Sequence, residues 1–198
     1  MKIIFLDRDG VINVDVSTSI SKEDRLRGFA NYVLKPEQLQ LIEGSDKAIK
    51  RLNQKGYYII VVTNQSCIAK RLITRNDLTY IHIELRFMLS KINAVIDEIR
   101  YCPHYPKYSD PTWDENLCVP CPCRKPGTFL FDMAAKKHGI ELRHCVFIGD
   151  STGDFLAAKN AGMTSIGVKT GFAGQDGKYD IEPDHWATNL EEAVGKYT

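Results

Sequence analysis

The sequence predicts an α/β fold built on a parallel, doubly wound sheet. Short apolar runs recur along the 198 residues, and each ends at polar or glycine-containing positions. Segments with helical periodicity separate these runs, and strands that alternate with helices form parallel sheets. Because 43% of the residues are hydrophobic, the chain can bury a core, and we expect residues 1–198 to form a single domain.

The N-terminal third should supply two strands and one helix. The apolar run at 2–6 predicts the first strand, and the aperiodic polar stretch at 14–31 predicts a long loop or a short helical insertion. A helix is expected at 45–55, because its apolar residues fall on one side and Gly56 follows as a stop. The run at 58–62 predicts the next strand.

A second helix should follow Thr74, because Thr74 and Asp77 resemble a capping box. Its apolar residues recur at helical spacing on one side: Leu78, Ile81, Leu85, Met88, Leu89 and Ile92. The run at 96–101 predicts a strand. Residues 102–126 are rich in proline, cysteine and aromatic residues and show neither helical nor strand periodicity, so we expect a long loop there.

The C-terminal part alternates between helices and strands. We expect helices at 128–138, 153–161 and 189–196, strands at 144–149, 164–168 and near Trp186, and a glycine-containing loop at 170–182. Helices that separate successive strands are the crossover connections that a parallel sheet needs.

Polar side chains follow the first apolar run in the order Asp7-Arg8-Asp9-Gly10. Two carboxylates spaced i and i+2 share a face if the strand continues, and they repel each other unless a cation or a proton lies between them. This arrangement suits a divalent metal and a nucleophile–acid pair. Asp and Gly are also ordinary turn residues, so a simple strand-to-loop turn is the alternative.

Three later segments strengthen the functional interpretation. They are Thr63-Asn64-Gln65-Ser66 after the second strand, Arg124-Lys125-Pro126-Gly127 before a helix, and Gly149-Asp150 with Asp154 after a later strand. In a parallel sheet, the carboxyl ends of the strands line the ligand crevice. Carboxylates, a hydroxyl, an amide and a lysine at that edge suit phosphate and Mg²⁺.

In this order, the motifs D-x-D-G-V, T-N, K-P and G-D-x-x-x-D resemble the four motifs of the haloacid dehalogenase-like hydrolases. The resemblance implies a Rossmann-like fold and a Mg²⁺-dependent phosphatase. We expect no cap domain, because the stretch 13–45 is too short for one and 64–125 is taken up by one helix, one strand and the cysteine-rich loop. Asp7 would then be the nucleophile and Asp9 the general acid and base. Asp7, the backbone carbonyl of Asp9, and Asp150 would hold Mg²⁺.

The same resemblance implies how phosphate is bound. Thr63 and Lys125 would hold phosphoryl oxygens, and Asn64 would help through its amide or backbone. Gln65 and Ser66 continue the turn that contacts phosphate or substrate, and Arg124 would bind a distal phosphate or a sugar hydroxyl through its planar fork. Two roles are open for Asp154: it could orient the ligands around the metal, or it could cap the helix that follows.

Five soft ligands lie between residues 102 and 123, and four of them would satisfy a tetrahedral zinc. Free thiols in a flexible loop are the alternative. The loop resembles the zinc loop of the D-glycero-D-manno-heptose 1,7-bisphosphate 7-phosphatases and of the phosphatase half of bifunctional histidine-biosynthesis enzymes. This implies Zn²⁺ on Cys102, His104, Cys121 and Cys123, with Cys118 as a surplus thiol or a replacement for Cys121.

The stretch after the second strand departs from that family, which usually reads T-N-Q-S-G-I-A-R-G. Here Cys67 and Arg71 stand in place of the glycines and Lys70 in place of the arginine. If the first glycine position needs a positive φ, Cys67 is strained there. The altered turn leaves the exact substrate open.

A net charge of +1 gives no reason to expect a nucleic-acid or membrane partner. The first apolar run is too short for a signal peptide or a membrane span, so we expect a cytoplasmic protein. Nothing in the pattern marks a self-complementary patch, so we also expect a monomer. The resemblance implies a phosphorylated sugar substrate, a heptose bisphosphate used for lipopolysaccharide, capsule or another glycan. The alternatives are a histidinol-phosphate phosphatase, another sugar or nucleotide phosphatase, and a zinc-stabilised binding protein on an inactive fold.

Overall fold

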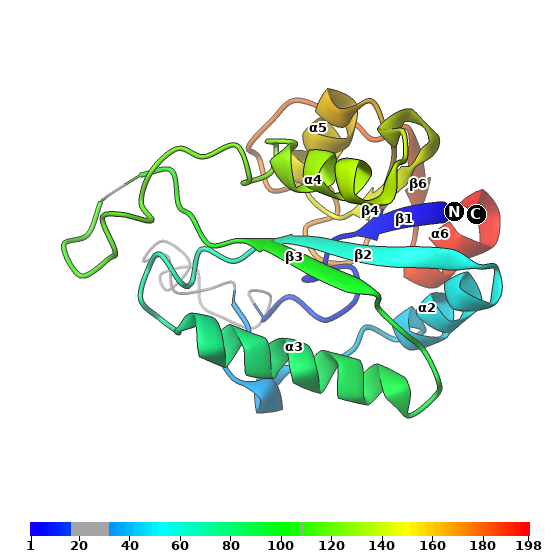
Figure 1. Ribbon diagram of the computed structural model, residues 1–198, viewed down its shortest axis with the longest axis horizontal. Helices are drawn as coiled ribbons and strands as arrows, with labels where there is room; N and C mark the ends of the chain where they lie inside the picture. The colour runs from blue at the N-terminus through cyan, green and yellow to red at the C-terminus, as the bar shows by residue number, and fades with distance from the viewer. Residues whose placement is uncertain (17–31, 108) are drawn as a thin grey trace.

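A parallel sheet runs through the protein, with helices on both faces (Figure 1). The computed structural model describes residues 1–16, 32–107 and 109–198. Within these residues, six strands pair in the order β3-β2-β1-β4-β5-β6, and every neighbouring pair is parallel. They are β1 (Lys2–Leu6), β2 (Tyr57–Asn64), β3 (Glu98–Cys102), β4 (Val146–Gly149), β5 (Thr164–Val168) and β6 (His185–Ala187). The predicted doubly wound sheet is confirmed, with its switch point between β1 and β4.

The helices divide into two layers (Figure 1). They are α2 (Ser45–Gln54), α3 (Arg75–Ser90), α4 (Phe129–His138), α5 (Thr152–Ala161) and α6 (Leu190–Tyr197), with short 3-10 helices at Pro36–Gln38 and Leu142–His144. Side chains alternate along the buried strands. Ile4 and Leu6 therefore pack with α2, α3 and α6, whereas Ile3 and Phe5 pack with α4 and α5.

The element bounds differ from the predicted ones at a few ends. β2 continues through Asn64, so the polar pair that was expected to follow the strand forms its last two residues. β3 starts at Glu98 rather than at 96, and α3 ends before Ile92. The capping box is confirmed, because the Asp77 amide donates to Thr74 Oγ1 at 3.2 Å. Of the insertion expected at 14–31, residues 17–31 lie outside the described residues.

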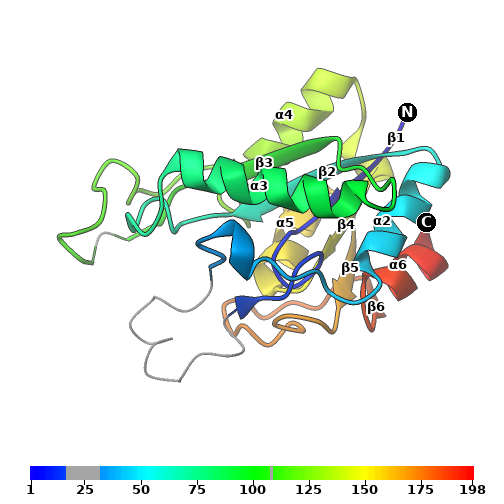
Figure 2. The ribbon, with the colours of Figure 1, turned by 90° about the horizontal axis from the view of Figure 1, so that it is seen from below.

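A long connection between β3 and α4 leaves the sheet at the carboxyl ends of the strands (Figures 1 and 2). It contains the cysteine-rich segment, and its described residues form no helix or strand, as predicted. The loop therefore projects from the edge of the sheet where ligands of such folds bind.

Candidate active site

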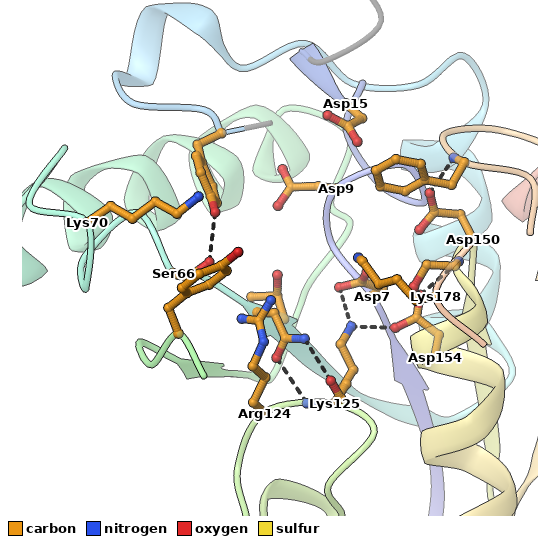
Figure 3. A pocket seen from close by; sticks show the side chains of 16 residues that line it. Asp7, Asp9, Asp15, Ser66, Lys70, Arg124, Lys125, Asp150, Asp154 and Lys178 are labelled. Atoms are coloured by element: carbon orange, nitrogen blue, oxygen red, sulfur yellow. Dashed lines mark hydrogen bonds and ion pairs between the residues drawn. The ribbon is translucent and has the colours of Figure 1, made fainter. Parts of the chain in front are cut away.

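The carboxyl ends of β1, β2 and β4 meet at one cavity of about 280 Å³. Asp7 directly follows β1, Thr63 lies near the end of β2, and Asp150 directly follows β4. These strands are neighbours in the sheet, so residues more than 80 positions apart line the same cavity. The structure thus brings the acids that the sequence places at strand ends (Figure 3) into one cavity with the Thr63 hydroxyl.

Three acids form a buried cluster on one side of this cavity. Carboxylate oxygens of Asp7, Asp150 and Asp154 all lie within 4.8 Å of one another. Lys125 Nζ pairs with Asp7 Oδ1 at 2.8 Å and with Asp154 Oδ1 at 2.6 Å, and it donates to the Val62 carbonyl at 2.9 Å. One ammonium group faces three carboxylates, so the cluster carries an excess of negative charge when all three are ionised.

This excess charge appears in the pKa values. Burial, reinforced by repulsion from Asp154 and Asp9, raises the pKa of Asp7 to about 7 against the opposing effect of Lys125. Burial, together with Asp154 and Asp7, raises the pKa of Asp150 well above its ordinary value. Burial alone would lower the pKa of Lys125, but the two carboxylates that it contacts raise it overall. Three hard carboxylate ligands with uncompensated charge fit a divalent cation such as Mg²⁺.

Asp9 is held apart from this cluster by a set of donors. Arg8 Nη2 lies 2.9 and 2.8 Å from the two Asp9 oxygens, and the amides of Asn13 and Gln65 donate to Asp9 at 2.9 and 2.8 Å. Burial raises the pKa of Asp9, but the Arg8 charge and these hydrogen bonds outweigh it, so that the pKa is lowered. The Asp9 carboxylate therefore has a fixed orientation.

Arg8 itself is fully buried, and its partner on a distant helix was not predicted. Its Nη1 lies 3.2 Å from His82 Nε2 on α3. Burial, together with the Arg8 charge, lowers the pKa of His82 to about 3, so the ring is neutral. Because arginine can only donate, His82 Nε2 accepts this hydrogen bond, and we assign the proton of the ring to Nδ1.

Two residues expected to contact phosphate or substrate have other partners. The Asn64 side chain accepts from the Lys125 amide at 3.1 Å and donates to the Lys125 carbonyl at 3.3 Å, so it fixes the backbone of Lys125 at the edge of the cavity. Gln65 is fully buried and does not line the cavity. The expected substrate contact of Gln65 is corrected accordingly: its amide donates to Asp9 and to Thr63 Oγ1 (3.0 Å).

Of the two interpretations of Asp154, the structure shows the contacts of the helix cap, and it also places the residue in the acid cluster. Its Oδ2 accepts from the Ser151 amide at 3.0 Å and from the Ser151 hydroxyl at 2.7 Å at the start of α5. Its Oδ1 faces Lys125 inside the acid cluster. The residue caps the helix and contributes to the negative charge of the cluster.

Two basic residues line the opposite side of the cavity, and we call Lys70 and Arg124 the basic side (Figure 3). Lys70 Nζ lies 4.7 to 5.3 Å from the ring centroids of three aromatic residues, Tyr32, Tyr105 and Trp113. Arg124 stacks over Tyr105 at 5.6 Å and donates to the His104 carbonyl at 3.1 Å. Sequence reasoning missed the aromatic residues, because nothing in a single chain links positions so far apart.

The altered turn after β2 is strained at a different position from the expected one. Cys67 is fully buried and is not among the residues with positive φ, so the condition under which strain was expected at this position is not met. Arg71, at the second glycine position, has φ 53°. The exposed side chain of Arg71 tolerates this left-handed conformation, although glycine would adopt it without strain.

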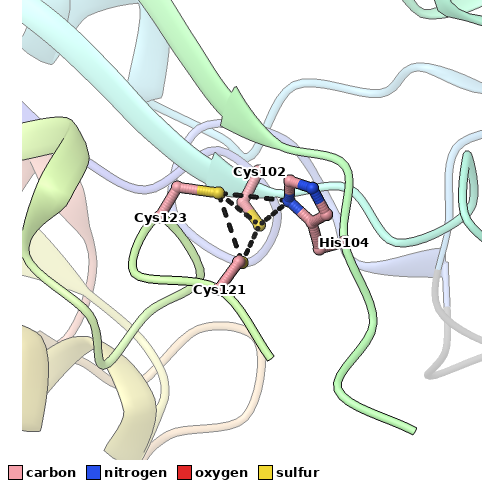
Figure 4. Close-up of side chains that lie close together, drawn as sticks. All are labelled: Cys102, His104, Cys121 and Cys123. Carbon is pink, nitrogen blue, oxygen red and sulfur yellow. Dashed lines mark hydrogen bonds between the residues drawn. The ribbon is translucent and has the colours of Figure 1, made fainter. Parts of the chain in front are cut away.

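Four potential soft ligands gather at the end of β3 and in the loop that follows (Figure 4). The nearest ligand atoms of Cys102, His104, Cys121 and Cys123 all lie within 4.8 Å of one another. Cys118 lies outside this Cys/His cluster, with its thiol 3.9 Å from the Ala69 carbonyl. Three sulfurs and one imidazole nitrogen are a donor set that suits tetrahedral Zn²⁺.

The comparisons with known proteins agree with this geometry. A model of the HAD-hydrolase-like family matches residues 122–193. A D-glycero-beta-D-manno-heptose-1,7-bisphosphate 7-phosphatase from Haemophilus ducreyi is 35% identical over 87% of this chain and 85% of the relative. A D-glycero-D-manno-heptose-1,7-bisphosphate 7-phosphatase from Chlorobaculum tepidum is 31% identical over 99% of this chain and 94% of the relative.

Solved structures show the same likeness. The crystal structure of D,D-heptose 1,7-bisphosphate phosphatase from B. bronchiseptica, complexed with magnesium and phosphate, superposes with a TM-score of 0.80. It is 30% identical, and the match covers 98% of this chain and 97% of that one.

Among the described residues, none of the helices has the length and apolar character to cross a membrane.

Proposed function

The chain belongs to the haloacid dehalogenase-like phosphatases, and we propose that it removes the 7-phosphate of a D-glycero-D-manno-heptose 1,7-bisphosphate with Mg²⁺ as cofactor. One observation carries the proposal: a single cavity has an acid cluster on one side and two cations on the other. The acid side suits a metal and a nucleophile, and the basic side suits the second phosphate of a bisphosphate. The named relatives support this choice of substrate.

Asp7, Asp150 and the backbone carbonyl of Asp9 are the residues that would hold Mg²⁺. When bound, the ion neutralises the carboxylates and stabilises negative charge on the phosphoryl oxygens. Lys125, which contacts Asp7, would bind a phosphoryl oxygen together with Thr63.

Asp7 would attack phosphorus, forming an aspartyl-phosphate as the bond between phosphorus and the sugar oxygen breaks. Asp9 would give its proton to the leaving sugar oxygen and then take a proton from the water that hydrolyses the intermediate. Arg8 and Gln65 would position Asp9 for both steps. The lowered pKa of Asp9 describes the free site, and an arriving phosphate dianion raises it by repulsion.

A structural Zn²⁺ on the Cys/His cluster would hold Arg124 of the basic side in place. Cys123 directly precedes Arg124, and the His104 carbonyl accepts a hydrogen bond from the Arg124 guanidinium. A metal that fixes Cys123 and His104 therefore fixes Arg124 at two points. The product, a heptose 1-phosphate, would serve the synthesis of activated heptose for lipopolysaccharide, capsule or another glycan.

The first test is a phosphate-release assay with Mg²⁺ on both anomers of the heptose bisphosphate, histidinol phosphate, fructose 1,6-bisphosphate and simple nucleotides. We expect kcat/KM for one heptose anomer to exceed the others by at least about 100-fold, or roughly 2.7 kcal/mol of transition-state discrimination. Phosphorus NMR of the product should show loss of the 7-phosphate. A preference for histidinol phosphate, or loss of the 1-phosphate, would overturn the proposed substrate or regiochemistry.

A further inference from the structure

The loop between β5 and β6 reaches both acidic strand ends. Thr170 Oγ1 donates to the carbonyl oxygen of Gly10 at 2.6 Å, and Gly10 completes the turn after β1. The Phe172 amide donates to Asp150 Oδ2 at 2.7 Å, and the Gly174 amide donates to the Asp150 carbonyl at 2.7 Å. Residues 170–174, which we call the clamp, thus join the two motifs that supply Asp7 and Asp150.

The backbone approaches Asp150 more closely than any side chain would allow. Gly10 and Gly171 both have positive φ, 80° and 63°. A Cβ atom on Gly10 would lie 2.3 Å from Asp150 Oδ2, and one on Gly171 would lie 2.1 Å from the same oxygen. Glycine at both positions therefore permits the contact, and the two backbone segments enclose one oxygen of the carboxylate.

Asp150 needs such a restraint because two further acids lie beside it. Asp7 and Asp154 lie within 4.8 Å of it, so repulsion favours rotation of its side chain away from the cluster. The Phe172 amide holds one oxygen on the clamp side. Thr170 does not line the cavity, so its hydroxyl acts on the backbone of the turn after β1 and not on a ligand in the cavity.

We propose that the clamp is a positioning element of the Mg²⁺ site, in which the Thr170 hydroxyl and the Phe172 amide hold the turn after β1 and the Asp150 carboxylate at one fixed separation. The inference rests on the proposed Mg²⁺ site. It gives a role in metal affinity to residues of the β5–β6 loop, which lie outside the four motifs that supply the ligands.

The test measures metal binding to the purified protein without substrate, using calorimetry with Mg²⁺ and electron paramagnetic resonance with Mn²⁺. Thr170→Val keeps the shape of the side chain but removes its donor, and it should weaken the Kd for both metals about five- to tenfold. Thr170→Ser keeps the donor and should restore the affinity to within about twofold. Gly171→Ala, which pushes against Asp150 Oδ2, should weaken binding further.

Thr79→Val is the matched control, because it also removes one hydroxyl hydrogen bond. On the exposed surface of α3, the Thr79 hydroxyl donates to the Arg75 carbonyl. The substitution should leave metal affinity unchanged. Unchanged affinity in Thr170→Val, or an equal loss in Thr79→Val, would overturn the clamp while leaving the proposed phosphatase intact. If the unaltered protein binds neither metal, the Mg²⁺ site of the proposed function fails first, and the clamp fails with it.

Discussion

The acid cluster and the Cys/His cluster both gather several potential metal ligands, but they are built in different ways. The acids come from residues 7, 150 and 154, which parallel strands bring together at the edge of the sheet. The cysteines and the histidine lie within 22 residues, from the end of β3 and one loop. The hydrophobic core positions the first cluster, whereas the second must itself organise the loop that carries it.

The two clusters also differ in their remaining capacity for ligands. At the proposed Mg²⁺ site, two carboxylates and one backbone carbonyl would leave coordination positions open for a substrate oxygen and water, as a catalytic cation requires. Three thiols and an imidazole complete a tetrahedron, as in structural zinc sites. We therefore expect loss of an acid to abolish chemistry without unfolding, and loss of a thiol to destabilise the fold.

The largest expected effect breaks the acid cluster alone. Asp7→Asn should lower turnover at least about 10⁴-fold, because it removes the nucleophile. The thermal unfolding midpoint should not fall, since the substitution removes one of three mutually repelling acids. Phosphate release and calorimetry check both expectations, and substantial residual turnover would rule out Asp7 as nucleophile.

Cys123→Ser breaks the other cluster. The zinc content measured by elemental analysis should fall from about one zinc per chain to a small fraction. The free energy of unfolding should also fall by several kcal/mol, because metal binding and folding are linked. Cys118→Ser is the control, since Cys118 is a buried thiol outside the cluster, and it should retain the zinc. Loss of zinc in the control instead would make Cys118 the third ligand.

Arg124→Met tests the region where the two clusters meet. Arg124 lies on the basic side and is tied to the carbonyl of His104. The KM for the bisphosphate should rise about 10- to 30-fold, with a much smaller change for a sugar monophosphate, because only the bisphosphate has a second anion to lose. Arg143→Met, at an exposed position, is the control for loss of one positive charge.

Arg71→Gly should have the smallest effect. It relieves a left-handed backbone in the turn between the clusters and should raise the free energy of unfolding by about 0.5–1 kcal/mol. The turn contacts the cysteine-rich loop, since the Asp114 amide donates to the Ala69 carbonyl at 2.8 Å. Chemical denaturation measures the change, and a destabilised variant would show that the Arg71 side chain contributes more than its backbone strain removes.

Sequence reasoning located the features that local patterns determine. Strand positions follow from apolar runs, and because parallel strands share a carboxyl edge, the placement of Asp7 and Asp150 at one site followed from the order of the elements. The partners of Arg8, Gln65 and Lys70 did not follow, because they depend on packing between distant segments. The backbone of the turn after β2 did not follow either: Cys67 is buried without a positive φ, and the left-handed residue of the turn is Arg71.

The basic side of the cavity has a consequence for the rate of turnover. After loss of its 7-phosphate, the proposed product would retain the 1-phosphate that Lys70 and Arg124 would bind. The contacts that would capture the proposed bisphosphate would therefore also delay departure of its product. Solvent viscosity should then slow kcat, and added heptose 1-phosphate should inhibit competitively, as expected of an enzyme limited by product release rather than by bond cleavage.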